Sequence, residues 1–170
     1  MKLKNFEKLP FEIATRLLTK DDNLAKEIIS LLCDDSNNLS SFVTKTLQEL
    51  IAEEYINFIP ATESGIKDIS KNTFLVINTE DFNFNLSDSN INVIGSIYIT
   101  TDKSHYLLSD NSLRLLKLAD AIISALDNEK MSSAGKISIS SMNYVVFSEF
   151  RGGFRINFRC VDQPTKKAEL

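Results

Sequence analysis

The chain has 170 residues, of which 43% are hydrophobic and 25% are charged. This composition is typical of a globular protein and differs from that of disordered chains. The formal net charge of −4 argues against a general nucleic-acid binder, which would need a basic face. The length fits one domain over residues 1–170, and no apolar run approaches the ~20 residues of a membrane span.

The first part of the chain predicts short helices separated by polar turns. Pro10 suits the first turn of one helix, and Asp21 offers an N-cap for the next. Ser40 or Ser41 is expected to cap a third helix. We therefore expect residues 1–60 to form a helical segment.

A connector over residues 60–72 separates this segment from a region rich in β-branched and aromatic residues. The adjacent glycines Gly152 and Gly153 predict a tight turn between the last two strands, because glycine tolerates positive φ angles. The expected strands cover residues 73–77, 82–86, 91–101, 136–140, 144–150 and 154–161.

One longer helix is predicted over residues 111–128, between the strands. Its expected apolar face comprises Leu115, Leu116, Ala119, Ile122, Ile123 and Leu126, and its expected polar face comprises Arg114, Lys117, Asp120 and Asp127. The predicted fold is α+β, with N-terminal short helices followed by a mostly antiparallel sheet on which one long amphipathic helix packs. Residues 73–162 would form this helix-on-sheet core, and residues 163–170 a loose tail.

The residues that usually carry chemistry are few and far apart. The single histidine, His105, is expected in a surface loop, and it has neither cysteine near it in sequence. We expect Cys33 and Cys160 to be isolated thiols in a reducing compartment rather than a disulfide. The glycine motifs that bind phosphate and the nucleophile elbow are absent from the sequence. We therefore expect no enzyme, no cofactor and no metal site.

Three arginines, Arg151, Arg155 and Arg159, recur at every fourth position near the end of the chain. Alternation along the last strand places Arg155 and Arg159 on the face opposite Phe154 and its apolar neighbours, while Arg151 lies in the predicted turn before it. They are the candidate interaction surface, suited to an acidic partner. The alternative interpretation is a solvated strand face, or edge charges that discourage unwanted strand pairing.

The order of elements resembles that of the tail terminator and related head–tail joining proteins of tailed bacteriophages. The resemblance covers residues 73–162: strands, a polar loop, the helix at 111–128, and closing strands that end in the arginine-bearing segment 154–158. It implies a homo-oligomeric ring, commonly six-fold, that contacts other particle proteins such as the tail tube or neck. It also implies a location in the bacterial cytoplasm or the virion, and contact with nucleic acid only where arginines line a channel. The helical N-terminal segment is an addition to this pattern.

Two other functions are compatible with the sequence. The first is a small intracellular adaptor or regulatory module that binds a partner protein through its N-terminal helices. The second is an enzyme of unfamiliar type, for which a deep pocket lined by converging polar side chains would be the indication.

Overall fold

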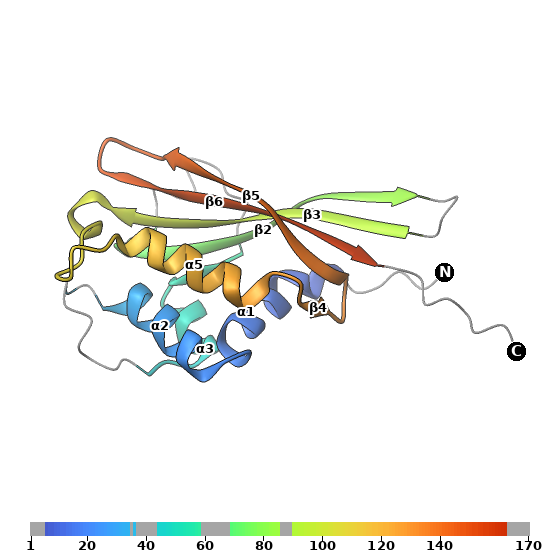
Figure 1. The fold of residues 1–170 in the computed structure, drawn as a ribbon, viewed down its shortest axis with the longest axis horizontal. Coiled ribbons are helices and arrows are strands. Elements are labelled where there is room, and N and C mark those ends of the chain that lie inside the picture. Colours follow the sequence, from blue (N-terminus) through green and yellow to red (C-terminus); the bar gives the residue numbers. More distant parts are fainter. Residues whose placement is uncertain (1–5, 35, 37–43, 59–68, 86–89, 163–170) are drawn as a thin grey trace, which may run out of the picture.

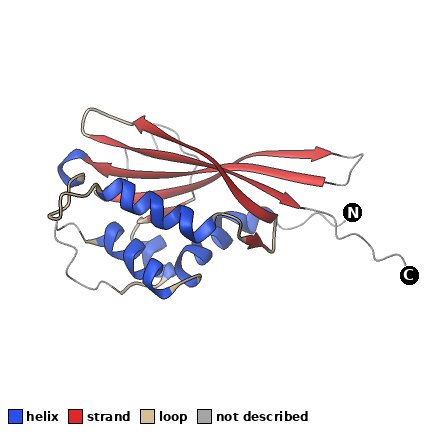
Figure 2. Ribbon diagram, viewed as in Figure 1, coloured by secondary structure: helices blue, strands red, loops and turns tan. Residues whose placement is uncertain are grey.

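The structure is a computed structural model that describes residues 6–34, 36, 44–58, 69–85 and 90–162. A six-stranded sheet carries helices on one face, which confirms the predicted α+β class (Figures 1 and 2). The α-helices are α1 (Leu9–Thr19), α2 (Asp22–Cys33), α3 (Leu47–Ala52) and α5 (Arg114–Leu126). Two 3-10 turns, η1 (Phe6–Lys8) and η2 (Lys103–His105), precede α1 and follow β3.

The strands are β1 (Ile56–Asn57), β2 (Thr73–Asn85), β3 (Asn90–Asp102), β4 (Lys130–Met131), β5 (Gly135–Val146) and β6 (Arg151–Asp162). Their order across the sheet is β1-β2-β3-β6-β5-β4. β1 runs parallel to β2, and the other neighbours are antiparallel. The last strand of the chain thus lies in the middle of the sheet, between β3 and β5.

Two strands are longer than the sequence pattern predicts. Residues 73–77 and 82–85 belong to the single strand β2, in which the register shifts between Thr79 and Asp81. A second shift, between Ile139 and Ser141, interrupts β5 in the same way. A bulge moves the inside–outside alternation by one residue, so that one bent strand resembles two short ones in sequence.

The helix starts follow the capping rules where the structure describes them. Pro10 lies in the first turn of α1. The Asp21 side chain accepts hydrogen bonds from the N–H groups of Asn23 (2.9 Å) and Leu24 (3.0 Å), as expected of an N-cap. Ser40 and Ser41 lie outside the described residues, and α3 is instead capped by Thr46 in a capping box with Glu49.

Three helices of similar length, rather than one long helix, pack on the sheet. α5 has 13 residues, α1 has 11 and α2 has 12. Fully buried residues of α1 and α2, such as Leu17 and Leu31, belong to the same hydrophobic cluster as Ile156 and Phe158 of β6. β6 keeps its predicted alternation, since Ile156, Phe158 and Cys160 are all completely buried under the helices.

The glycine pair was predicted to form the hairpin turn, and this prediction is wrong. β6 already begins at Arg151, and residues 147–150 connect it to β5. A Cβ atom at Gly153 would overlap the backbone carbonyl of Ile99 in β3, and one at Gly152 would overlap the hydroxyl groups of two tyrosines. These glycines are therefore explained by close packing inside the sheet, not by a positive φ.

The assigned faces of the 111–128 helix also need correction, because Arg114 is completely buried and Leu116 is 44% exposed. The Arg114 guanidinium donates hydrogen bonds to the carbonyl oxygens of Leu31 (2.8 Å), Asp34 (2.7 Å), Ser36 (2.8 Å) and His105 (3.1 Å). The first two of these carbonyls lie at the C-terminal end of α2, where the last helical carbonyls lack intrahelical partners and the helix dipole favours a cation.

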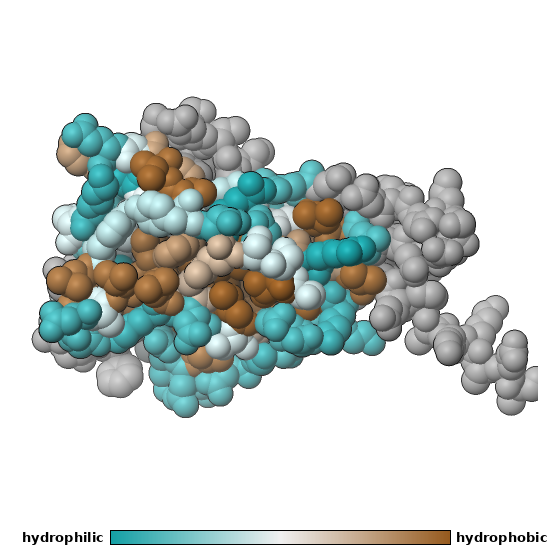
Figure 3. Space-filling model, turned by 45° about the horizontal axis from the view of Figure 1, so that its top comes forward, coloured by the Kyte–Doolittle hydropathy of each residue, from teal (hydrophilic) through white to brown (hydrophobic). Residues whose placement is uncertain are grey.

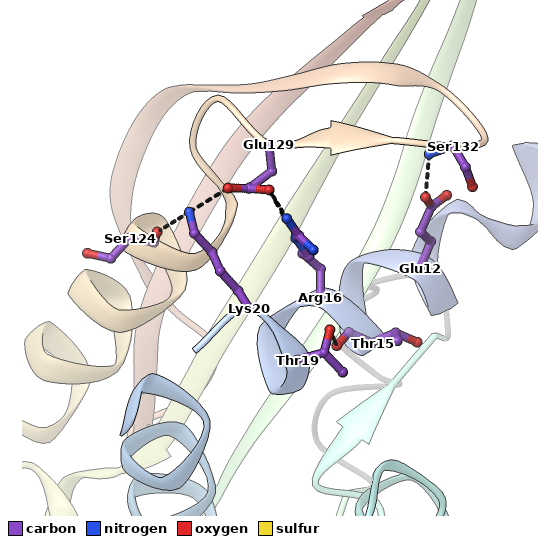
Figure 4. A network of polar contacts seen from close by, with 8 residues as sticks. All are labelled: Glu12, Thr15, Arg16, Thr19, Lys20, Ser124, Glu129 and Ser132. Atoms are coloured by element: carbon purple, nitrogen blue, oxygen red, sulfur yellow. Dashed lines mark hydrogen bonds and ion pairs between the residues drawn. The ribbon is translucent and has the colours of Figure 1, made fainter. Parts of the chain in front are cut away.

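A polar network ties α1 to the segment between α5 and β5 (Figure 4). Arg16 and Lys20 of α1 both form ion pairs with Glu129. These contacts lower the pKa of Glu129, with the hydrogen bond from Lys20 contributing most and that from Arg16 next. Glu12, one turn earlier, accepts hydrogen bonds from the backbone N–H groups of Ser132 and Ser133.

Candidate functional site

Arg151, the first of the three predicted interaction residues, is occupied by contacts within the chain. Its guanidinium pairs with Asp102 (2.8 Å) and donates to the carbonyl oxygens of Ile69 (3.1 Å) and Lys71 (3.0 Å). It also lies over the ring of Phe74, 5.0 Å from the ring centroid. Its side chain is only 12% exposed. Arg151 thus fastens the connector before β2 to the sheet, and little of its side chain is left exposed for the predicted interaction surface.

Arg155 and Arg159 lie on the face of the sheet opposite the helices, as their spacing predicts. Arg155 forms an ion pair with Glu80 (2.6 Å) and lies 5.6 Å from the ring centroid of Tyr98. Arg159 is exposed. Register places Lys136 on the same face as Arg159, and Lys130 directly opposite Lys136.

The three residues Lys130, Lys136 and Arg159 form a small basic group on this face. In the part of the chain that the structure describes, no ion pair involves any of them. Like charges on adjacent strands repel each other, and an acidic surface placed against them would relieve that repulsion. Of the three predicted arginines, Arg159 is exposed and forms no described ion pair, while the charge of Arg155 is partly neutralised by Glu80.

The chemically reactive side chains lie apart from one another. His105 ends η2 and its Nδ1 lies 2.9 Å from the Ser104 hydroxyl. Cys33 ends α2 and packs against the core, while burial raises the pKa of the Cys160 thiol in β6 to about 12. Among the described residues, no group of three His, Cys, Asp or Glu side chains is placed to hold a metal ion.

A second surface, which sequence reasoning missed, lies along the outer edge of β5. β4 pairs only with Gly135 and Lys136, and the backbone of Asn128 and Glu129 bonds with Ile137. Beyond these contacts, no described strand pairs with this edge. The edge therefore offers backbone donors and acceptors to another strand.

The direction of these backbone groups follows from the hairpin. Phe147 donates its N–H to the carbonyl of Arg151 (3.0 Å). In an antiparallel ladder every second residue bonds the neighbouring strand and the residues between them face away. Met142, Tyr144 and Val146 consequently direct their N–H and C=O groups outward from the sheet.

The same three residues expose apolar side chains on the helix side of the sheet. Met142 is 39% exposed, Tyr144 53% and Val146 65%. We call the outer edge of β5 and the exposed side chains of Met142, Tyr144 and Val146 the β5 edge patch. Figure 3 turns the β5 side of the molecule forward and shows hydrophobic residues gathered in a band across it.

Two tyrosines link this patch to the loop before α5. The hydroxyl groups of Tyr106 and Tyr144 lie 3.2 Å apart, which joins the loop before α5 to β5. Burial, followed by the hydrogen bond with Tyr144, raises the pKa of Tyr106. Tyr144 also packs edge-on against Phe154, with ring centroids 5.7 Å apart. These contacts hold the exposed tyrosine in one position, so the patch is preorganised rather than loose.

No described helix is long and apolar enough to cross a bilayer. A search of curated proteins finds no match to the chain. A family model does match: that of the YomW family, over residues 25–160. The match covers most of α2, the whole sheet except the last residues of β6, and both surfaces described above. The chain therefore belongs to the YomW family, which is a phage-associated family.

Proposed function

We propose that the protein is a structural assembly protein of a phage or phage-like particle, acting by contact between subunits. The observation that carries this proposal is the β5 edge patch, where an unpaired strand edge and exposed apolar side chains coincide. Folded proteins usually blunt such an edge with charges, proline or a covering element. Contiguous exposed apolar surface commonly marks a site of protein association.

The specific form that we propose is a ring-forming tail terminator or head–tail joining subunit. A ring needs contact surfaces on two sides of each subunit. The β5 edge patch supplies one of them. The basic group of Lys130, Lys136 and Arg159 supplies a second contact surface of different chemistry. Exposed acidic residues such as Asp21 and Asp22, at the start of α2, offer a complementary charge.

The adaptor alternative has less support from the packing. It requires the N-terminal helices to present a binding face, but the apolar residues of α1 and α2 are largely buried against the sheet and α5. Phe11 is the exposed apolar residue of α1, at 48%, and its ring lies near that of Phe58. Deleting residues 1–60 would remove part of the hydrophobic core, and so could not separate partner binding from folding.

The proposal is tested in the phage or prophage that encodes the chain. We expect the protein to co-sediment with particles, and deletion of its gene to leave heads and tails unjoined in electron micrographs. Val146→Lys should reproduce this defect, because it places a charge in the β5 edge patch. Phe11→Lys, an equivalent change at an exposed residue of α1, is the control. Normal particles without the protein would refute the proposal.

A further inference from the structure

We infer that the β5 edge pairs with the β5 edge of a second copy of this chain, in an antiparallel two-fold contact. The inference rests on the proposed function and names the occupant of the patch. It follows from the direction of the backbone groups, the absence of charged residues from Ile137 to Ser148 and the symmetry of the exposed side chains of β5.

The backbone allows a symmetric register centred on Tyr144. In an antiparallel contact between identical strands, Tyr144 faces Tyr144 of the second copy and Met142 faces Val146. All three residues direct their N–H and C=O groups outward, so each facing pair can exchange two hydrogen bonds. A two-fold contact of this kind is isologous, since both copies use the same surface.

The charge pattern of β5 permits contact with a second copy. A two-fold contact places identical residues close to each other, so any charge on the strand would meet a like charge. The segment from Ile137 to Ser148 contains no charged residue. The central strand β3 has a similar uncharged stretch over residues 90–101 and is paired on both sides.

The other sheet edge behaves differently. β1 covers only Leu75 and Val76 of β2, and the uncovered part of β2 carries Glu80 and Asp81 at its bulge. β5 also has a bulge, between Ile139 and Ser141, so the difference between the two edges lies in the charged residues, which are one way in which an edge resists pairing. From Ile137 onward β5 therefore lacks charged residues, as an interior strand does, although it lies at an edge of the sheet. β2, in contrast, carries the charged residues that are typical of an edge strand.

The side chains add a matching apolar contact. The two copies of Met142, Tyr144 and Val146 would lie together on the helix side of the joined sheet. These side chains would give the contact an apolar centre of the kind found in stable homodimers. If dimers of this kind form the ring proposed above, the ring contains an even number of subunits, which includes the hexamer expected from the sequence.

The first experiment compares adjacent valine-to-proline variants in the purified full chain. Val146→Pro removes an outward N–H and leaves the ladder between β5 and β6 intact. Val145→Pro removes an N–H that bonds β6. We expect light scattering to show the wild type as a dimer or an even-numbered assembly. Val146→Pro should lose the dimer contact and keep the wild-type circular dichroism, whereas Val145→Pro should unfold at lower temperature.

The second experiment tests the register without relying on a proline variant. Tyr144→Cys should form a covalent dimer with a short bismaleimide reagent, because the two introduced thiols face each other. Met142→Cys mixed with Val146→Cys should form a dimer faster than either variant alone. Thr19→Cys, at an exposed position of α1, is the control for non-specific cross-linking. The unsubstituted protein reports any cross-linking through Cys33.

Dimers with this cross-linking pattern would support the inference. It is overturned if the wild type is monomeric at ~100 μM, well above the Kd of a stable dimer. It is also overturned if Tyr144→Cys links no faster than Thr19→Cys, or if Val146→Pro keeps the wild-type mass. In those cases co-sedimentation with particles would still support the assembly role, with a different occupant of the patch. A protein that neither dimerises nor joins particles would remove both proposals.

Discussion

Replacing Arg114 by methionine is expected to destabilise the protein more than any other change of a charged residue in α5. Methionine is unbranched and apolar, so it can occupy much of the same space but donates no hydrogen bond. Of the four carbonyls that Arg114 contacts, those of Leu31 and Asp34 belong to residues that are 0% and 8% exposed. Water cannot readily replace the arginine at these two sites. The carbonyls of Ser36 and His105 lie on more exposed residues and can be hydrated.

The size of the effect follows from the two buried carbonyls. Each buried acceptor that loses its partner destabilises the fold by about 1–3 kcal/mol, so the two together give roughly 2–6 kcal/mol. This is a large part of the total stability of a domain, about 5–15 kcal/mol. For a chain of this length, a loss of ~4 kcal/mol lowers the melting temperature by roughly 8–16 °C.

Urea unfolding followed by circular dichroism measures this change directly. Lys117→Met is the matched control, since Lys117 is a cation on the same helix whose ion pair with Asp110 (2.7 Å) is exposed. Exposed pairs contribute about 0–1 kcal/mol, so the control should stay close to the wild type. A loss below ~1 kcal/mol in Arg114→Met, or equal losses in both variants, would refute the inference that Arg114 satisfies the end of α2.

Three further predictions follow from the packing and the ionisable groups. Gly153→Ala should lower the melting temperature more than Gly152→Ala, because the added methyl meets rigid backbone at the first position and movable tyrosine hydroxyls at the second; equal shifts would contradict this. The pKa of Glu129 is depressed below its ordinary value of 4.5, so its stabilising effect is present above that pH and is lost as the pH falls through the lower folded value. Urea titrations from pH 7 to pH 3 should therefore show a smaller acid loss in Glu129→Gln, together with lower stability at pH 7. Burial raises the pKa of Cys160 to about 12. In a Cys33→Ala variant, the Cys160 thiol should therefore not react with a thiol reagent at pH 8 until urea unfolds the chain. Rapid labelling of Cys160 in the native protein would contradict its burial.

Features that depend on local pattern could be predicted from the sequence. The α+β class, the cap at Asp21 and the alternation of β6 each follow from neighbouring residues, and the structure confirms them. The arginine face follows from the same alternation. The removal of Arg151 from that surface does not, because its partners Asp102 and Ile69 are 49 and 82 positions away in the chain.

Features that depend on distant packing could not be predicted. An arginine at the start of an amphipathic helix has the same local pattern whether it faces water or the end of α2. A glycine pair suits a tight turn and a close contact between strands equally well. The sequence pattern therefore predicts a turn at Gly152 and Gly153, where the structure has a close contact within the sheet. The β5 edge patch was missed for a related reason, since an uncharged strand gives no sign of whether it lies inside a sheet or at its edge.

The strand order has a consequence for how the protein is made. β6 joins β3 to β5, yet it spans residues 151–162. During synthesis at about 5–20 residues per second, β3 is completed several seconds before β6. In that interval β3 and then β5, each with a long uncharged stretch, lack β6 as a neighbour, and the apolar faces of α1 and α2 have only part of the sheet to cover them.

The nascent chain therefore passes through a stage that is open to aggregation. Native pairing of the central strands is a late event. We expect a chain that stops before β6 to remain unfolded and bound to chaperones, and premature termination before or within residues 151–162 to abolish the native protein.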